Sequence, residues 1–239
     1  MREATALQMI LESRIPTGLG GRWYGVYPAL VNDIRDPDGQ GRVKIILPWS
    51  SDTGGSRYEA WARLATLMGG NNRGSWFIPD VNDEVLVCFE GGDPRRPFVV
   101  GGLWNGSDNP PESMDGAGNN YKKVLCSRNG VKCTLDDQEG QEKLILETPG
   151  GQKITLEDGP GSIEMVDSNG NSIKLEASGI TMSTPAKLTI TASQVEISAS
   201  MVTVNAGTSQ FNGPVMASVS VQTPSVIGAS YTPGAGNIW

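Results

Sequence analysis

Residues 144–175 read LILETPGGQKITLEDGPGSIEMVDSNGNSIKL, and a triplet of apolar, polar and apolar residues returns along them at short intervals. The triplet continues to about residue 204, with steps of 7 to 10 residues between copies. Turn residues such as Pro149-Gly150-Gly151 and Asn169-Gly170 separate the early copies. Each copy is therefore predicted to be a short strand followed by a tight corner. The apolar pairs are Leu144/Leu146, Ile154/Leu156, Ile163/Met165, Ile173/Leu175, Ile180/Met182, Leu188/Ile190, Val195/Ile197 and Val202/Val204.

A unit this short cannot bury its apolar face alone. Side chains alternate across a strand, so each copy presents only two apolar residues to one side, and stacking must complete the core. A single-chain parallel β-solenoid and an intertwined β-helix of several chains both meet this requirement. The later steps of 7 or 8 residues are too short for a full solenoid turn but suit one face of a triangular prism. We therefore favour three parallel chains that share hydrogen-bond ladders between subunits.

Upstream of the repeat, residues 22–106 alternate short β-forming segments with turns such as Asp36-Pro37-Asp38-Gly39. Five or six short strands with closely spaced turns are typical of a small closed barrel such as an OB-fold. The sequence thus predicts an all-β chain, with an N-terminal OB-fold barrel followed by an intertwined triple-stranded β-helix formed by a homotrimer. The expected barrel strands are 24–34, 42–47, 61–67, 74–78, 84–89 and 97–103.

The same patterns divide the chain. Only Lys187 and Glu196 are charged among residues 180–239, which indicates a segment that lies within a multi-chain β assembly. The expected parts are 1–21, an N-terminal arm or docking segment; 22–106, the OB-fold domain; 107–120, a linker; 121–204, the β-helix spike; and 205–239, the C-terminal spike end with a tip-docking segment.

Composition excludes several classes of function. None of the 239 residues is histidine, which excludes Ser/His/Asp and Cys/His catalytic sets and His-ligated metals. The net charge of −7 argues against a nucleic-acid partner. No apolar run approaches the ~20 residues of a membrane span, and the N-terminus lacks a signal-peptide pattern, so we expect assembly in the cytoplasm.

Three cysteines, Cys88, Cys126 and Cys133, are too few for a disulfide framework and fit reduced thiols. Cys126 and Cys133 flank an Asn129-Gly130 turn and could lie close on paired strands, but buried free thiols are the preferred interpretation.

Residues 41–106 combine glycine, tryptophan and charged residues in a distinctive order. The segments are Gly41-Arg42-Val43-Lys44, Leu47-Pro48-Trp49, Trp61-Ala62-Arg63-Leu64-Ala65, Pro79-Asp80-Val81-Asn82-Asp83-Glu84-Val85-Leu86-Val87 with Phe89, Gly92-Asp93-Pro94-Arg95-Arg96-Pro97, and Val99-Val100-Gly101-Gly102-Leu103-Trp104-Asn105-Gly106. They resemble the phage baseplate assembly protein V and VgrG spike family. The resemblance is strong over about residues 22–106, and the repeat extends it, as a similar type of segment, to about residue 204. The resemblance implies a homotrimeric central spike of a contractile tail or injection system, which sheath contraction drives through the target envelope.

The resemblance also implies partners. The chain lacks the large hub domain fused in full-length VgrG proteins and the lysozyme domain of some spikes, so a separate baseplate hub protein is expected. It has no histidine for the iron-bound tip of some short spikes, so a PAAR-repeat tip protein is the expected replacement. We expect Asn237, Ile238 and Trp239 to dock this tip, and the Arg95-Arg96 turn to face the hub. An ordinary charged hairpin turn is the alternative for these two arginines.

No catalytic, cofactor-binding or metal-binding residue is expected, and the chain is not predicted to be an enzyme. The pairs Asp136-Asp137 and Glu157-Asp158 are interpreted as solvated corners, because adjacent strand residues point to opposite faces. Two alternatives remain: a β-helical glycan-binding or glycan-cleaving protein of the tailspike kind, and an OB-fold binding module. For the second, the tryptophans at 49, 61, 76 and 104 would form a stacking platform, although core and rim packing is the preferred interpretation.

Overall fold

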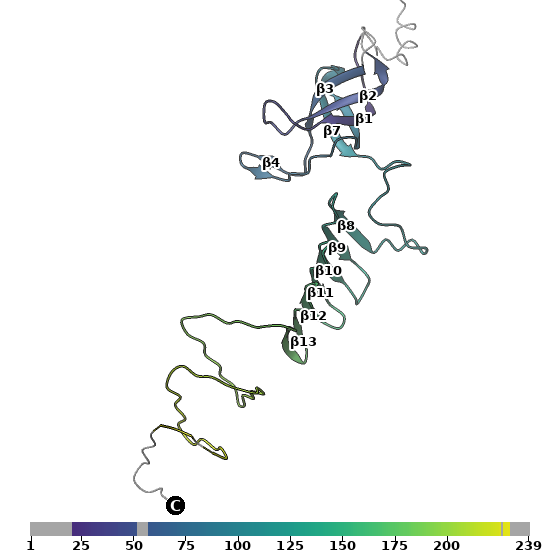
Figure 1. The fold of residues 1–239 in the computed structure, drawn as a ribbon. Coiled ribbons are helices and arrows are strands. Elements are labelled where there is room, and N and C mark those ends of the chain that lie inside the picture. Colours follow the sequence, from purple (N-terminus) through teal and green to yellow (C-terminus); the bar gives the residue numbers. More distant parts are fainter. Residues whose placement is uncertain (1–20, 52–56, 226, 230–239) are drawn as a thin grey trace, which may run out of the picture. The chain divides into compact units, whose positions relative to one another are not determined.

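The computed structural model describes residues 21–51, 57–225 and 227–229, and all of its β-strands lie in the first of two compact units, which ends at Lys187 (Figure 1). The expected N-terminal arm, residues 1–21, lies outside the described residues apart from Gly21. The all-β class predicted from the sequence is confirmed.

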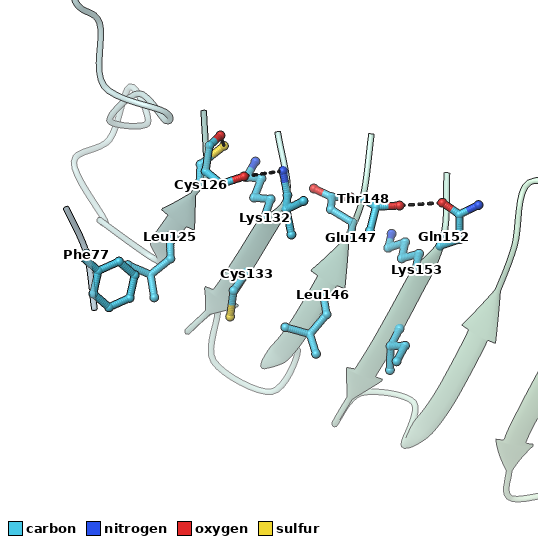
Figure 2. Close-up of a pocket in the computed structure, with 13 residues that line it drawn as sticks. Phe77, Leu125, Cys126, Lys132, Cys133, Leu146, Glu147, Thr148, Gln152 and Lys153 are labelled. Carbon is cyan, nitrogen blue, oxygen red and sulfur yellow. Dashed lines mark hydrogen bonds between the residues drawn. The ribbon is translucent and has the colours of Figure 1, made fainter. Parts of the chain in front are cut away.

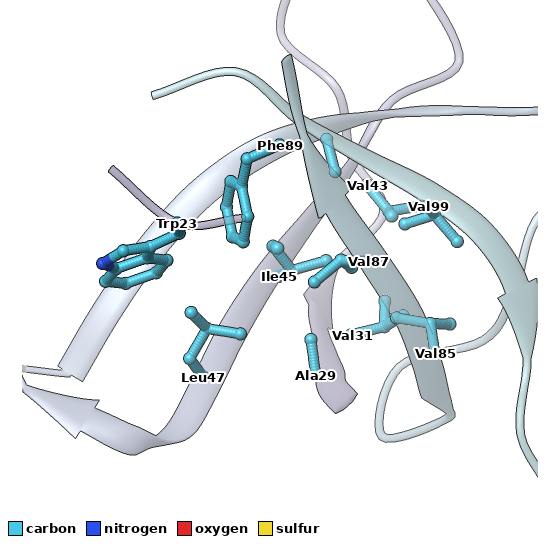
Figure 3. Close-up of a cluster of buried hydrophobic side chains, with 11 residues drawn as sticks. Trp23, Ala29, Val31, Val43, Ile45, Leu47, Val85, Val87, Phe89 and Val99 are labelled. Atoms are coloured by element: carbon cyan, nitrogen blue, oxygen red, sulfur yellow. The ribbon is translucent and has the colours of Figure 1, made fainter. Parts of the chain in front are cut away.

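Five strands close a barrel in the order β1-β2-β3-β7-β6, with β3 and β7 parallel and the other neighbours antiparallel. Alternation along β2 sends Val43, Ile45 and Leu47 inward, where all three are fully buried. Figure 3 shows these side chains interlocking with those of β1 and β6. The predicted closed barrel is therefore confirmed. Its strands are β1 (Val26–Asp33), β2 (Val43–Ser51), β3 (Arg57–Leu64), β6 (Glu84–Phe89) and β7 (Pro97–Gly102).

One predicted barrel strand, 74–78, is wrong. The chain instead forms a small hairpin outside the barrel, from β4 (Gly69–Gly70) and β5 (Arg73–Gly74), and continues through residues 75–78 without a strand. The physical reason is that the barrel closes through the parallel pairing of β3 with β7, which leaves no free ladder for residues 75–78. Trp76 and Phe77 are consequently exposed.

The repeat forms a seven-stranded antiparallel sheet in which each strand pairs with the next along the chain. Leu144 lies opposite Leu156, and Ile154 lies opposite Met165, so the apolar positions of successive copies are aligned. The strands predicted for the first five apolar pairs are confirmed. The sheet contains β8 (Lys122–Cys126), β9 (Lys132–Asp136), β10 (Lys143–Glu147), β11 (Lys153–Glu157), β12 (Ser162–Val166), β13 (Ser172–Glu176) and β14 (Gly179–Ser183).

The expectation that hydrogen-bond ladders are shared between parallel chains is wrong for residues 122–183, because these strands pair antiparallel within one chain. Short turns explain the difference: a tight turn reverses the chain and places each copy antiparallel beside its predecessor, so the hydrogen-bonding edges of the strands are paired within one chain. In the turn after β10, Gly151 has a φ of +89°, and its N–H donates to the Thr148 carbonyl oxygen at 3.0 Å.

The second unit, from Leu188 onward, contains no strand among its described residues. The last three apolar pairs of the repeat, Leu188/Ile190, Val195/Ile197 and Val202/Val204, are all exposed there. A single chain therefore does not form the strands expected at these positions.

Candidate functional site

One face of the β8–β14 sheet is almost entirely apolar. Since alternate residues of a strand point to opposite faces, the aligned register gathers two side chains per strand on this face, in two parallel rows. We call it the apolar face. One row contains Leu125, Cys133, Leu146, Ile154, Met165, Ile173 and Met182, and the other contains Leu135, Leu144, Leu156, Ile163, Leu175 and Ile180, with Lys123 at its end.

The described residues leave much of this face uncovered. Leu146, Leu156, Ile163 and Met182 are among its exposed members. Figure 2 shows Leu125, Cys133 and Leu146 on neighbouring strands along a groove of about 560 Å³ that Ile154 also lines. Exposed apolar surfaces of this continuity mark interaction sites in soluble proteins. The apolar face is therefore the principal candidate site of the chain.

The opposite face of the sheet is mostly polar, although Val124, Ile145 and Val166 also lie on it. Thr155 and Glu164 lie on it as cross-strand neighbours, and its edge carries an ion pair between Lys143 and Glu157 at 2.7 Å. A charged and hydroxylic surface of this kind is suited to water. The two faces therefore have opposite solvent preferences, which fixes the direction in which the sheet can associate.

The turns are held by side-chain bonds to the backbone. In the turn after β12, the Asp167 carboxylate accepts hydrogen bonds from Asn171 Nδ2 at 2.7 Å and from the backbone N–H groups of Asn169 and Asn171, both at 2.9 Å. The side-chain bond from Asn171, followed by the backbone bonds, lowers the pKa of Asp167 to about 2. These hydrogen bonds pair the backbone N–H groups of the turn. They help to fix the register of β12 and β13, which aligns the two apolar rows.

The Arg95-Arg96 turn is exposed and internally paired. The guanidinium of Arg95 donates to both oxygens of Asp93, at 3.0 and 2.8 Å, and Arg96 donates to Glu90 at 3.2 Å. The Arg95 side chain holds the pKa of the Asp93 carboxyl well below its usual range. These bonds fit the charged-hairpin alternative, and the hub-facing role of the turn stays a prediction. The predicted tip-docking residues Asn237, Ile238 and Trp239 lie outside the described residues.

One carboxylate of each pair considered for catalysis has a lysine partner. Asp137 lies 3.5 Å from Lys123, and Glu157 forms the ion pair with Lys143. Among the residues that the structure describes, no three Asp, Glu or Cys side chains converge as possible metal ligands.

The tryptophans considered as a stacking platform have different surroundings. Trp49 stacks on Tyr27 with ring centroids 5.3 Å apart, while the Trp61 ring contacts the cationic groups of Arg42 and Lys44. Trp76 and Trp104 are exposed. Packing at the rim of the barrel therefore accounts for the first two.

The first two strands of the sheet, β8 and β9, lie upstream of the eight apolar pairs identified from the sequence. Cys133-Thr134-Leu135 follows the same triplet pattern, with cysteine in an apolar place, and this signal could have extended the repeat upstream. Cys126 and Cys133 are free thiols on neighbouring strands and point to opposite faces, because Cys133 is paired with Leu125. Cys126 is exposed, so the expected burial is wrong for this thiol.

Comparisons with known proteins match both parts of the chain. Residues 27–104 match the model of the type VI secretion system/phage-baseplate injector OB domain, and residues 143–210 match the phage baseplate V C-terminal trimerisation domain. The chain is 30% identical over 116 residues to the type VI secretion system spike protein VgrG1b of Pseudomonas aeruginosa, covering 46% of this chain and 16% of that protein. It is 30% identical over 115 residues to the spike protein VgrG3 of Vibrio cholerae, covering 46% of this chain and 11% of that protein.

The chain thus spans less than a fifth of the length of these two relatives. Within its described residues there is no helix long and apolar enough to cross a membrane. The two family models match separate segments, in the order barrel then repeat, and together they cover more than half of the chain. The chain therefore belongs to the phage baseplate V and VgrG spike family, with an injector OB domain and a C-terminal trimerisation domain.

Proposed function

We propose that this chain forms the homotrimeric central spike of a contractile tail or injection system. The observation that carries the proposal is the apolar face of the β8–β14 sheet, which needs a partner of matching shape and chemistry. Three copies that turn this face toward a common axis would cover it, and the match of residues 143–210 to a trimerisation domain supports that number.

The dimensions of the sheet also suit three copies. Strands of five residues are about 17 Å long, and a triangular prism with sides of that length places each sheet about 5 Å from the axis. Two packed sheets are about 10 Å apart, so side chains from three such sheets just meet at the centre. Two narrow sheets packed face to face would leave both lateral edges of the core open, whereas three close it.

The proposed action is mechanical, without covalent chemistry. A trimer with seven strands of each chain stacked along its axis would form a shaft about 30 Å long over residues 122–183, at about 4.8 Å per strand. Removing one chain would expose the two apolar rows along their whole length, and bending the shaft would disturb their packing at the bend. This resistance suits a rod that pierces a target envelope when a sheath contracts, and the relatives named as spike proteins support the role.

The expected partners complete the proposal. The barrel, residues 22–106, would attach to a separate baseplate hub protein with the Arg95-Arg96 turn on the hub side, and residues 1–21 would be an arm or docking segment. Residues 107–120 would link the barrel to the spike, residues 121–204. Residues 205–239 would form the end of the spike, where a PAAR-repeat tip protein would dock at Asn237, Ile238 and Trp239. The particle would be a baseplate assembled in the cytoplasm. The alternative of a glycan-cleaving tailspike is less well supported, because Asp137 and Glu157 have lysine partners.

Sedimentation equilibrium tests the trimer. We expect a particle with three times the 25.4 kDa chain mass at micromolar concentration, and a monomer would refute the proposal. Capture of a PAAR-repeat protein by the full chain, compared with a chain ending at residue 225, tests the tip. Equal capture by both chains would exclude residues 226–239 from that contact.

A further inference from the structure

A hairpin between β3 and β6 is held in shape by internal hydrogen bonds but is exposed. We call residues 66–78 the arm; it includes β4 and β5 and stands off the barrel in Figure 1. Thr66 Oγ1 donates to the Ser75 carbonyl oxygen, and Ser75 N–H donates to the Met68 carbonyl oxygen, both at 2.9 Å. A Cβ on Gly74, where φ is +145°, would lie 2.4 Å from that oxygen, so the close approach requires glycine.

The base of the arm, on both sides of β4 and β5, carries large apolar side chains that the described residues leave uncovered. The exposed fraction is 98% for Leu67, 55% for Met68, 75% for Trp76 and 73% for Phe77. Arg73 is the single charged residue among residues 66–78. A hairpin whose bonds hold it in shape, and whose surface is apolar, is expected to pack against another surface.

The arm is continuous with the apolar face of the sheet. Phe77 lines the same groove as Leu125 and Cys133, and Figure 2 shows its ring beside Leu125. The loop that follows the arm is joined to the β8–β9 turn by an ion pair, in which Arg128 Nη1 donates to Asp80 at 2.7 Å. A second copy that covers the apolar face would therefore reach Phe77 as well.

We propose that the arm packs against a second copy of this chain and extends the subunit interface from the spike to the barrel. This inference rests on the proposed trimer. Its mechanical consequence is that the barrel of one subunit is held directly by its neighbour. Axial load would then pass between the barrel and the shaft through the arm as well as through residues 107–120.

Methionine oxidation of the intact protein tests the inference. Met68 lies on the arm, Met165 and Met182 lie on the apolar face, and Met114, with an exposed fraction of 63%, lies between the two family domains. Met114 and Met68 are similarly exposed in one chain, so Met114 is a matched internal control. The protein is treated with dilute hydrogen peroxide, and the rate at each methionine is measured by peptide mass spectrometry.

If the arm packs on a second copy, Met68 is oxidised about tenfold more slowly than Met114, which corresponds to about 1.4 kcal/mol of protection. Protection of Met165 and Met182, with Met68 as reactive as Met114, would support the trimer and overturn the arm contact, leaving another partner such as the hub for this surface. Reactive Met165 and Met182 would instead show failure of the proposed trimer. The monomeric variant Leu156→Lys is the second control. Met68 should react there at the Met114 rate, and persisting protection would assign it to contacts within one chain and refute the inference.

Discussion

Leu156→Lys is the substitution that most directly tests the apolar face. Leu156 lies in the middle of the sheet, between Leu144 and Ile163, and its exposed fraction is 40%. Full burial of a leucine is worth about 1.5–3 kcal/mol, so the part of Leu156 still exposed in one chain accounts for about 0.6–1.2 kcal/mol. A symmetric trimer loses this contribution three times, which amounts to about 2–4 kcal/mol.

The lysine charge adds a larger cost. Each ammonium group buried near the axis costs several kcal/mol, and three of them would also repel one another. The total is about 10 kcal/mol or more per trimer, which corresponds to about a 10⁷-fold change in the equilibrium constant for assembly. We expect Leu156→Lys to sediment at the 25.4 kDa mass of one chain at micromolar concentration.

Thr155→Lys is the matched control. It introduces the same charge one residue away, on the polar face, directly opposite Glu164. A cross-strand pair of opposite charge contributes about 0.2–1 kcal/mol, so this variant should remain a trimer. Circular dichroism checks that both variants keep their strands. A trimeric Leu156→Lys variant with wild-type thermal stability would refute the assignment of this face as the interface, and dissociation of both variants would show that the sheet itself does not tolerate lysine.

Three further predictions concern the barrel and the arm. Leu47→Ala removes a fully buried side chain and should lower the unfolding free energy of the barrel by about 2–5 kcal/mol in urea titrations, whereas Val100→Ala, at an exposed position, should change it by less than about 0.5 kcal/mol. Gly74→Ala should strain the arm by about 1–3 kcal/mol and speed hydrogen exchange of residues 66–75, and unchanged exchange would contradict the role of this glycine. The Arg42 side chain, which donates to Asp36 at 2.7 Å, holds the pKa of that carboxyl well below its ordinary 3.8. The ionised Asp36 carboxylate therefore stabilises the folded barrel above about pH 4, and this contribution is lost as the pH falls. The stability difference between wild type and Asp36→Asn should accordingly shrink between pH 7 and pH 3, and a constant difference would refute this linkage.

The barrel core was largely predictable because its signal is local. Val43, Ile45 and Leu47 alternate with polar or less buried residues along one strand, and such alternation specifies which side chains point inward whatever the partner strands are. The same reasoning predicted a barrel strand at residues 74–78 that the structure does not contain. Trp76 and Phe77 have the residue types of a strand, but the pairing of Arg63 with Phe98 and of Leu64 with Val99 already closes the barrel. That pairing joins segments more than thirty residues apart and has no local signal.

The candidate site was predictable in its residues more than in its arrangement. The pairs Ile154/Leu156 and Ile163/Met165 were identified from spacing alone, and the structure places both on the apolar face. The contribution of Cys133 was missed because cysteine interrupts the aliphatic pattern. The arm was missed because the exposure of Leu67 depends on what the folded chain leaves uncovered.

The spacing of apolar residues specifies the strands of residues 143–183, the side chains that share a face, and the need for further chains to cover that face. Tertiary structure decided that successive copies pair with each other in one chain, that β3 meets β7 in parallel, and that the arm is left outside the barrel. The physical reason is that side-chain alternation is a property of each strand, whereas the partner of a strand depends on the geometry of its turns and on competition among all other strands for the same hydrogen-bonding edge.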